Sequence, residues 1–239
     1  MKNVLITGAN KGIGLETAKQ LAQLNYYVFL GSRDEKKGND TVNKLKASGI
    51  SNVELVKIDV TDIASIMQAK TIMESKIEAL DVLINNAAIT GEQPQNISTS
   101  DIELYKKVFY TNYFGSIRTT QQFFRLLQKS AQPHIINISS EVGSLTMHSS
   151  PGRNSNWDLY NAYASSKVAL NSFTVMLANE LRSTKFRVNS VTPGYTATDL
   201  NQHRGYKTVE EGAKPIVKLV TESSVETGKF IKEGGEVPW

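Results

Sequence analysis

Two tyrosines and a lysine lie close together in the segment "YNAYASSK", residues 160–167. On a helix, Tyr163 would lie one turn from Lys167 and Tyr160 two turns from it, on the same face. Free tyrosine has a pKa of about 10 and is a slow acid at neutral pH. A neighbouring lysine ammonium favours the phenolate and lowers that pKa, so either tyrosine could serve as a proton donor. The alternative is an ordinary amphipathic helix.

A glycine-rich turn forms the second candidate site. The segment "TGANKGIG", residues 7–14, follows an apolar run and precedes a segment of helical period. Its glycines, Gly8, Gly12 and Gly14, permit a tight turn and let the backbone approach a pyrophosphate, whose charge suits the free N–H groups of the next helix. A glycine turn without a ligand is the alternative, but the position between strand and helix favours dinucleotide binding.

The end of the second apolar run bears on which dinucleotide is bound. NAD-binding proteins carry a carboxylate there that holds the adenosine ribose. Here Ser32 stands at that place and Arg33 follows it. A small side chain leaves room for a 2′-phosphate, which a guanidinium binds with two parallel hydrogen bonds, and Lys11 in the glycine turn can add a second charge. This pattern predicts NADPH/NADP, although both cations could be ordinary surface residues. Asp34 could instead hold the ribose if the strand ended one residue later.

The elements that must position these residues follow a strand–helix rhythm. Short apolar runs recur in the order "NVLIT", "YYVFLG", "VELVKI", "DVLINN", "HIINIS", "RVNSVT" and "GKFI". Seven such runs, without polar alternation and separated by helical segments, predict a parallel sheet covered on both faces. Right-handed crossovers then give an α/β fold, a Rossmann-type doubly wound sheet of about seven strands with helices on both faces.

Two of the helical segments carry more detailed expectations. Residues 62–80 show one apolar stripe at helical spacing, with the methionines taken as core residues. The residues of this stripe are Ile63, Ile66, Met73, Ile77 and Leu80. Near the carboxyl end, Thr208 and Glu211 predict a capping box, and Pro215 is expected to kink the helix or to end its first segment.

Composition sets the remaining limits. The 239 residues suit a single dinucleotide-binding and catalytic domain spanning 1–239. Lys and Arg exceed Asp and Glu by 27 to 23 without a dense basic run, which does not suggest a nucleic-acid partner. Cysteine is absent and the three histidines lie far apart, so no metal site is expected. The first residues reach a glycine turn too soon for a signal peptide, and no apolar run approaches the roughly 20 residues that span a bilayer, which leads us to expect a cytoplasmic protein with no membrane partner.

The sequence resembles the short-chain dehydrogenase/reductases across nearly its whole length. The matching segments, in order, are "TGANKGIG", "DV" at 59–60, "NNAA" at 85–88, Asn112, "SS" at 139–140, "YASSK" at 163–167 and "PGYTATD" at 193–199. Within that family it looks most like the NADPH-dependent carbonyl reductases. The features that suggest this are Lys11 with Arg33, the long gap before Tyr163 and the run "TGKFIKEGGEVPW".

The resemblance implies catalytic roles. The family pattern Tyr-x-x-x-Lys selects Tyr163 as the proton donor to a carbonyl oxygen and leaves Tyr160 lining the substrate cleft or packing against its rim. Lys167 would tune the phenol and hold the nicotinamide ribose. Ser140, the second serine of its pair, would hydrogen-bond the same carbonyl oxygen. Asn112, a poor helix former inside a helical segment, would hold a water that links the lysine to solvent.

The resemblance also implies a set of cofactor contacts. Asp59 and Val60 should flank the adenine, and Asn86 and Ala87 should pass beside its ribose. The two threonines after the "PG" turn should meet the carboxamide and the pyrophosphate of the nicotinamide half. The full set is Gly8, Asn10, Lys11, Gly12, Ile13, Gly14, Arg33, Asp59, Val60, Asn86, Ala87, Tyr163, Lys167, Pro193, Gly194, Thr196 and Thr198.

The expected function is NADPH-dependent reduction of an aldehyde or ketone, a small-molecule carbonyl substrate whose identity stays open. The alternatives are an alcohol dehydrogenase working in the oxidative direction, perhaps with NAD, and a non-catalytic nucleotide-sensing protein. Residues 199–207 are expected to form a short mobile lid. Residues 144–159 are extra chain above the active site, either a substrate wall or a cover for a surface that relatives use to oligomerise. Monomer and homo-oligomer therefore both remain open.

Overall fold

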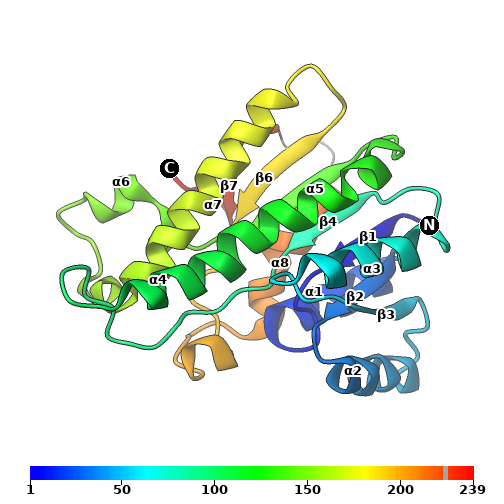
Figure 1. Ribbon diagram of the computed structural model, residues 1–239, viewed down its shortest axis with the longest axis horizontal. Helices are drawn as coiled ribbons and strands as arrows, with labels where there is room; N and C mark the ends of the chain where they lie inside the picture. Colours follow the sequence, from blue (N-terminus) through cyan, green and yellow to red (C-terminus); the bar gives the residue numbers. More distant parts are fainter. Residues whose placement is uncertain (223–225) are drawn as a thin grey trace.

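A computed structural model describes residues 1–222 and 226–239 and, within them, shows one eight-stranded sheet (Figure 1). The strands are β1 (Asn3–Ile6), β2 (Tyr27–Ser32), β3 (Val53–Lys57), β4 (Val82–Asn85), β5 (His134–Ile138), β6 (Arg187–Val191), β7 (Phe230–Lys232) and β8 (Gly235–Glu236). Their order is β3-β2-β1-β4-β5-β6-β7-β8. The first seven are parallel, as the apolar runs predict, whereas β8 pairs antiparallel with β7. Strand β8 was not predicted, because a two-residue strand has no apolar run.

Helices cover both faces of the sheet (Figure 1). They are α1 (Gly12–Gln23), α2 (Glu35–Ala47), α3 (Ile63–Glu74), α4 (Ile102–Phe109), α5 (Gly115–Gln128), α6 (Leu145–His148), α7 (Asn161–Glu180) and α8 (Val209–Thr221). Short turns are the π-helical η1 (Tyr110–Phe114) and the 3-10 segments η2 (Glu141–Gly143), η3 (Ser155–Tyr160) and η4 (Asp199–Asn201). Core side chains of α1, α2 and α8 pack on one face of the sheet, and those of α3, α5 and α7 pack on the other.

Alternation along each strand builds the two cores. In β1, Val4 and Ile6 belong to one cluster of buried side chains and Leu5 to the other. Because both faces are covered, the strands read as continuous apolar runs. The chain passes outward from β1 to β3 and then crosses back to β4 on the other side of β1. The predicted doubly wound fold is confirmed, and the crevice at this reversal, at the carboxyl ends of β1 and β4, is the usual ligand site of such folds.

The helix predicted from the apolar stripe over residues 62–80 is present as α3, but it ends at Glu74, before the stripe does. Asp62 caps α3, and its carboxylate accepts a hydrogen bond from the N–H of Ala64. Ile63 therefore lies in an exposed first turn, while Met73 is buried near the end of the helix. Leu80 is also buried, but it lies beyond α3, in the connection to β4. Not every methionine is a core residue, because Met67 is exposed.

Helix α8 begins at the predicted capping box and continues through Pro215. Thr208 and Glu211 form the reciprocal capping box, with N···O distances of 3.2 and 2.8 Å. Pro215 does not end the helix, which continues to Thr221. Its buried residues include Ile216 and Leu219, which pack against the sheet. Burial of this apolar face stabilises the helix despite the hydrogen bond that proline removes.

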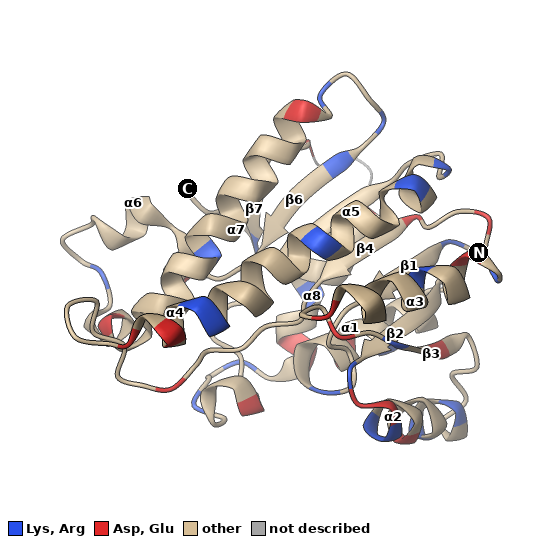
Figure 2. Ribbon diagram, in the orientation of Figure 1, with Lys and Arg blue, Asp and Glu red and all other residues tan. Residues whose placement is uncertain are grey.

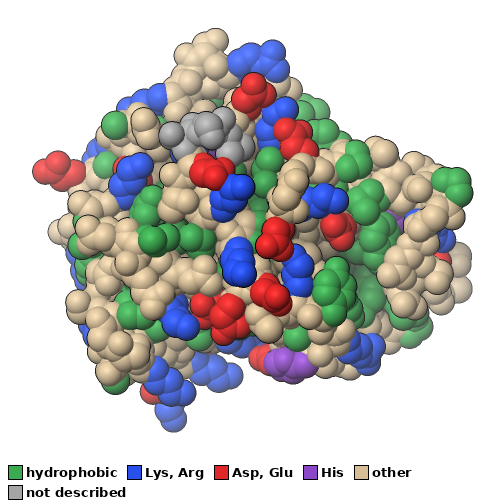
Figure 3. Space-filling view, turned by 180° about the vertical axis from the view of Figure 1, so that it is seen from behind, with side chains coloured by type: hydrophobic (Ala, Val, Ile, Leu, Met, Phe, Trp, Pro, Cys, Tyr) green, Lys and Arg blue, Asp and Glu red, His purple; other side chains and the backbone are tan. Residues whose placement is uncertain are grey.

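Charged side chains are dispersed over the molecule. Blue and red segments are scattered over the ribbon in Figure 2, and basic and acidic side chains intermingle across the middle of the opposite face in Figure 3. This agrees with the scattered charges of the sequence. Among the described residues, no helix combines the length and the apolar character that crossing a membrane requires.

Candidate active site

The glycine turn lies against the end of β4. Gly8 and Gly12 have φ values of +64° and +59°, in the left-handed region that favours glycine. A Cβ on Gly8 would lie 2.9 Å from Cα of Ala87, and one on Gly14 would lie 2.5 Å from Nδ2 of Asn86. Larger residues would therefore push the turn away from β4. The turn thus keeps its backbone at the crevice, as a pyrophosphate site requires.

Helix α1 differs from its neighbours at its N-terminus. Lys11 occupies the N-cap position without a capping side-chain hydrogen bond, whereas Asp34, Asp62 and Asp101 cap α2, α3 and α4. The first N–H groups of α1 therefore remain open to an anion, and the helix dipole favours negative charge there. Together with the glycine turn, this end of α1 fits the pyrophosphate of a dinucleotide.

Of the three residues at the end of β2, Ser32 and Asp34 form local hydrogen bonds and Arg33 is exposed. The strand ends at Ser32, as predicted, and the buried Ser32 hydroxyl donates to the carbonyl oxygen of Asp34 at 2.8 Å. The Asp34 carboxylate accepts from the N–H of Lys37 at 3.0 Å, and this bond, with the Lys37 charge, lowers the pKa of Asp34. Arg33 is exposed and forms no ion pair within residues 1–222 and 226–239. Asp34 thus acts as a helix cap, and Arg33 is exposed.

Other predicted cofactor residues are held in place by their own contacts. The Asn86 amide donates to the carbonyl oxygens of Thr7 at 2.8 Å and Gly8 at 3.0 Å, which ties β4 to the glycine turn. The carboxylate of Asp59 accepts from both the N–H and the hydroxyl of Thr61. Val60 packs against α5, where a Cβ on Gly115 would come within 2.9 Å of its side chain. This close approach explains a glycine inside the helical segment.

Helix α7 positions the Tyr-x-x-x-Lys pair. Lys167 is buried, its Nζ donates to the carbonyl oxygen of Ile138 at 2.7 Å, and it lies 5.5 Å from the centroid of the Tyr163 ring. Tyr160 lies at the N-cap of α7, which begins at Asn161. Only Tyr163 therefore shares the helix with Lys167, contrary to the expectation that both tyrosines lie on one helical face.

Burial controls the titration of this pair. It lowers the pKa of Lys167 to about 7. It raises the pKa of Tyr163 above its ordinary value of 10, while the neighbouring Ser140 hydroxyl acts in the opposite direction. The lysine four residues away is expected to lower the phenol's pKa, whereas desolvation is the main influence on the phenol and raises its pKa. A phenol whose pKa is raised stays protonated at neutral pH, which is the state that a proton donor needs.

The two serines after β5 have different surroundings. The N–H of Ser139 continues the sheet by donating to Val191 at 2.8 Å, and its buried hydroxyl has no hydrogen-bond partner among the described residues. Ser140 is half-buried and close enough to Tyr163 to affect its pKa. The structure therefore brings Ser140, Tyr163 and Lys167 together and places Ser139 in the core.

Asn112 lies in the π-helical turn between α4 and α5, a distortion often found at functional sites. Its Oδ1 accepts from the N–H of Ile89, and its Nδ2 donates to the carbonyl oxygen of Ile89 and to Oγ of Ser166, all at 2.9 Å. The Ser166 hydroxyl in turn donates to the carbonyl oxygen of Tyr163 at 2.7 Å. Both amide hydrogens of Asn112 are thus engaged, so this side chain fixes α7 relative to the chain after β4.

The segment after β6 forms a closed loop. Gly194 has φ +76°, and a parallel bridge joins Thr196 to Lys207, with the N–H of Ala197 donating to the Lys207 carbonyl at 2.8 Å. Thr196 and Thr198 are largely buried, and Thr198 caps η4. The predicted lid over residues 199–207 is therefore tied at both ends and contains a helical turn.

The insert, residues 144–159, docks onto the chain's last residues. The Ser144 hydroxyl donates to the Pro238 carbonyl at 2.5 Å, and the N–H of Thr146 donates to the Trp239 carbonyl at 2.9 Å. Tyr110 and Phe114, on the outer face of the α4–α5 segment, remain 43% and 44% exposed. The insert therefore does not cover that part of the surface.

Two residues that contact the candidate site, Gln95 and Asp199, were not predicted from the sequence. Gln95 is fully buried, and its Oε1 accepts from the N–H groups of Ala162 and Tyr163 at 2.9 and 3.1 Å, 67 and 68 residues away. No local pattern reveals such a contact. Asp199 forms an ion pair with Lys11 at 2.7 Å. Its place in "PGYTATD" is a signal that could have drawn attention to it.

Comparisons with known proteins agree with this geometry. Residues 2–208 match the family model for short chain dehydrogenase. "Short-chain dehydrogenase/reductase 1" of Saponaria officinalis is 35% identical, covering 90% of this chain and 88% of that protein. (+)-Neomenthol dehydrogenase of Capsicum annuum is 31% identical, with 90% of each chain covered. The crystal structure of NADPH-bound carbonyl reductase from chicken fatty liver superposes with a TM-score of 0.87 at 29% identity, covering 100% of this chain and 99% of that one. The protein belongs to the short-chain dehydrogenase family.

Proposed function

We propose that this protein is an NADPH-dependent reductase that transfers hydride to the carbonyl carbon of an aldehyde or ketone. The observation that carries the proposal is the grouping of Ser140, Tyr163 and Lys167 beside the β1–β4 crevice that holds the glycine turn. Membership of an oxidoreductase family fixes the broad reaction class. The direction, the cofactor and the residue roles are our inference.

The chain's own groups have distinct roles in this mechanism. NADPH, when bound, supplies the hydride. Ser140 and Tyr163 donate hydrogen bonds to the carbonyl oxygen, and Tyr163 transfers its proton there as negative charge develops. Lys167, in its ammonium form, stabilises the phenolate that remains. Asn112 acts by fixing α7, through Ser166, in the position that this geometry needs.

The proposed preference for NADPH rests on the end of β2. Ser32 is small, Asp34 is engaged as a helix cap, and the exposed Arg33 directly follows the strand end at which the ribose is expected. A guanidinium binds a phosphate with two parallel hydrogen bonds, an interaction that the ribose hydroxyl of NADH cannot make. A structurally similar carbonyl reductase is described with NADPH bound.

A second candidate is alcohol oxidation by the same site. The observation that favours it is Lys167, whose pKa is lowered to about 7, so that part of its population can accept a proton at neutral pH. A relative named (+)-neomenthol dehydrogenase supports this direction as well. A non-catalytic nucleotide sensor is less well supported, because it would not need the complete Ser–Tyr–Lys set.

The experiment that tests the proposal compares the two cofactors. Oxidation of NADPH and of NADH is followed with a panel of aromatic aldehydes, quinones and diketones. We expect kcat/KM with NADPH to exceed that with NADH by roughly tenfold or more, as the loss of a charge-assisted phosphate contact implies. Equal use of NADH would refute the roles of Arg33 and Lys11. NADPH binding without turnover on any carbonyl, or turnover only of alcohols with NADP, would favour the alternatives.

A further inference from the structure

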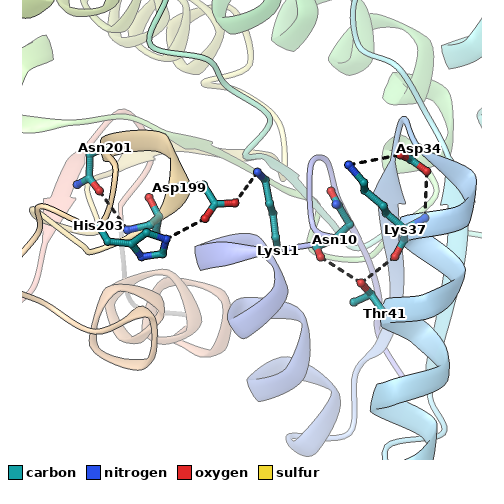
Figure 4. A network of polar contacts seen from close by, with 9 residues as sticks. Asn10, Lys11, Asp34, Lys37, Thr41, Asp199, Asn201 and His203 are labelled. Carbon is teal, nitrogen blue, oxygen red and sulfur yellow. Dashed lines mark hydrogen bonds and ion pairs between the residues drawn. The ribbon is translucent and has the colours of Figure 1, made fainter.

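Lys11 and Asp199 join the glycine turn to the segment 199–207 across the site. Lys11 Nζ lies 2.7 Å from Oδ2 of Asp199, 188 residues further along the chain. Both side chains are exposed, 65% and 56% respectively, so solvent and ligands can reach the pair. Figure 4 shows the Lys11 side chain extended toward Asp199. Asp199 therefore engages the Lys11 ammonium, which is the second cation expected to bind the cofactor's 2′-phosphate.

Several contacts keep Asp199 beside the glycine turn. A Cβ on Gly12 would lie 3.6 Å from Cγ2 of Thr198, so the turn and the residue before Asp199 are in van der Waals range. The other carboxylate oxygen, Oδ1, lies 2.9 Å from Nε2 of His203. The Lys11 hydrogen bond, followed by that of His203, lowers the pKa of Asp199, so the carboxylate is ionised at neutral pH.

The opposite side of the turn faces α2 and the ribose-binding region. The carbonyl oxygen of Asn10 accepts from the Thr41 hydroxyl of α2 at 3.1 Å. In Figure 4 the Asp34–Lys37 pair lies on this α2 side, whereas Lys11 points to the other side, toward Asp199. Arg33 has no such partner among the described residues. Of the two predicted phosphate-binding cations, then, Arg33 is exposed without an ion pair among the described residues, and Lys11 is engaged by a carboxylate.

We propose that Asp199 is a positioning residue for cofactor specificity, because its carboxylate competes with the 2′-phosphate for the Lys11 ammonium. This inference rests on the proposed use of NADPH. A ligand with a 2′-phosphate must draw Lys11 away from Asp199, whereas a ligand without it can bind while the pair persists. Exposed ion pairs are weak, so a phosphate dianion can displace the carboxylate. Asp199 therefore reduces the preference for NADPH over NADH without abolishing it.

The test uses nucleotides that carry no nicotinamide, so that binding is measured apart from turnover. Adenosine 2′,5′-bisphosphate and 5′-AMP, which differ only by the 2′-phosphate, are titrated calorimetrically into the intact protein. We expect Asp199→Asn to raise the affinity ratio between them by about two- to fivefold, the range that one exposed ion pair implies. Removing a nearby negative charge also affects the 5′-phosphate, but that effect is common to both ligands and cancels in the ratio.

A variant pair and a control isolate the interaction. In a Lys11→Gln background, Asp199→Asn should leave the ratio unchanged, because no ammonium remains to compete for. Glu233→Gln is the control, because Glu233 pairs with Lys207, at the other end of the segment 199–207, with an N···O distance of 2.8 Å. Removing this carboxylate from the wild type should not change the affinity ratio. Thermal unfolding of each variant checks that the fold is retained.

The outcomes separate this inference from the proposed function. Suppose that the affinity ratio of the bisphosphate to 5′-AMP falls with Lys11→Gln or Arg33→Gln but is unchanged or lowered by Asp199→Asn. The proposed competition for Lys11 is then wrong, and the proposed use of NADPH still stands. The same is true if Asp199→Asn raises the ratio equally with and without Lys11. If the wild type does not prefer the bisphosphate over 5′-AMP, and Lys11→Gln and Arg33→Gln do not change the affinity ratio, both the inference and the proposed cofactor are wrong.

Discussion

Gln95 accepts a hydrogen bond from the backbone N–H of Tyr163, at 3.1 Å, although the two residues are 68 positions apart. The same oxygen accepts from Ala162, and the amide nitrogen donates to the carbonyl oxygens of Thr90 and Glu92. One fully buried side chain thus caps the start of α7 and ties it to the chain after β4. Because Tyr163 lies in the first turn of α7, Gln95 helps to fix the direction of the phenol.

Replacing Gln95 should therefore affect both stability and turnover. We expect Gln95→Ala to lower the free energy of unfolding by about 1–3 kcal/mol, since it leaves the N–H groups of Ala162 and Tyr163, the first of them buried, without their partner. We also expect kcat to fall roughly tenfold or more, because small displacements of an acid group are costly, with a smaller change in KM for NADPH. Denaturant unfolding and steady-state kinetics measure the two effects.

Asp62→Ala is the matched control for lost capping. Asp62 caps α3 through the N–H of Ala64 at 2.9 Å, on a helix that carries none of the proposed catalytic residues. It should lose about 0.5–2 kcal/mol of stability and keep its kcat. A Gln95→Ala enzyme with wild-type kcat would show that Gln95 supports the fold without positioning Tyr163.

The Arg33 guanidinium is expected to distinguish the two cofactors. We predict that Arg33→Gln lowers kcat/KM for NADPH by roughly tenfold or more and changes that for NADH little, because only the 2′-phosphate is lost as a partner. Lys36→Gln, which removes another exposed cation three residues further on, is the control for general charge. Equal losses with both cofactors would mean that Arg33 does not contact the 2′-phosphate.

Burial of Lys167 should make stability depend on pH. Its pKa is about 7 in the folded protein, whereas an unburied lysine has a pKa of 10.5, so between these values the unfolded state binds more protons. The wild type's free energy of unfolding should therefore rise with pH in this window relative to that of Lys167→Met, which carries no titrating group there. Between pH 6.5 and 8.5 the gain should be on the order of 2 kcal/mol.

Parallel denaturant titrations of wild type and Lys167→Met at several pH values measure this difference. His134, which is buried with its pKa well below the ordinary value, is common to both proteins and cancels. A constant difference across the window would indicate that Lys167 keeps its charge in the fold at all these pH values.

The sequence was sufficient for features that depend on local pattern. The seven parallel strands followed from uninterrupted apolar runs, and the Thr208–Glu211 box followed from its spacing. The glycine turn and the Tyr163–Lys167 spacing on α7 could likewise be placed from short motifs. Each of these features is determined within a few neighbouring residues.

Features that depend on distant contacts could not be predicted. The Gln95 cap joins residues 67 and 68 positions apart, and the Lys11–Asp199 pair joins residues 188 positions apart, which no periodicity encodes. The raised pKa of Tyr163 depends on burial, which outweighs the charge effect expected from spacing alone. Of the two expectations for Pro215, a kink or the end of a segment, the second is not met, because packing of α8 on the sheet overrides local propensity.

The role of Tyr163 as the proton donor is central to the proposed mechanism, and its most direct test is the kcat of Tyr163→Phe with NADPH and a carbonyl substrate that the wild type reduces. Phenylalanine keeps the ring and removes the acid, so we predict a loss of about 10²–10⁴-fold in kcat with NADPH affinity nearly unchanged. Tyr160→Phe, outside α7, should keep its kcat and change mainly KM. Near-normal turnover by Tyr163→Phe, or an inactive Tyr160→Phe beside an active Tyr163→Phe, would contradict this mechanism.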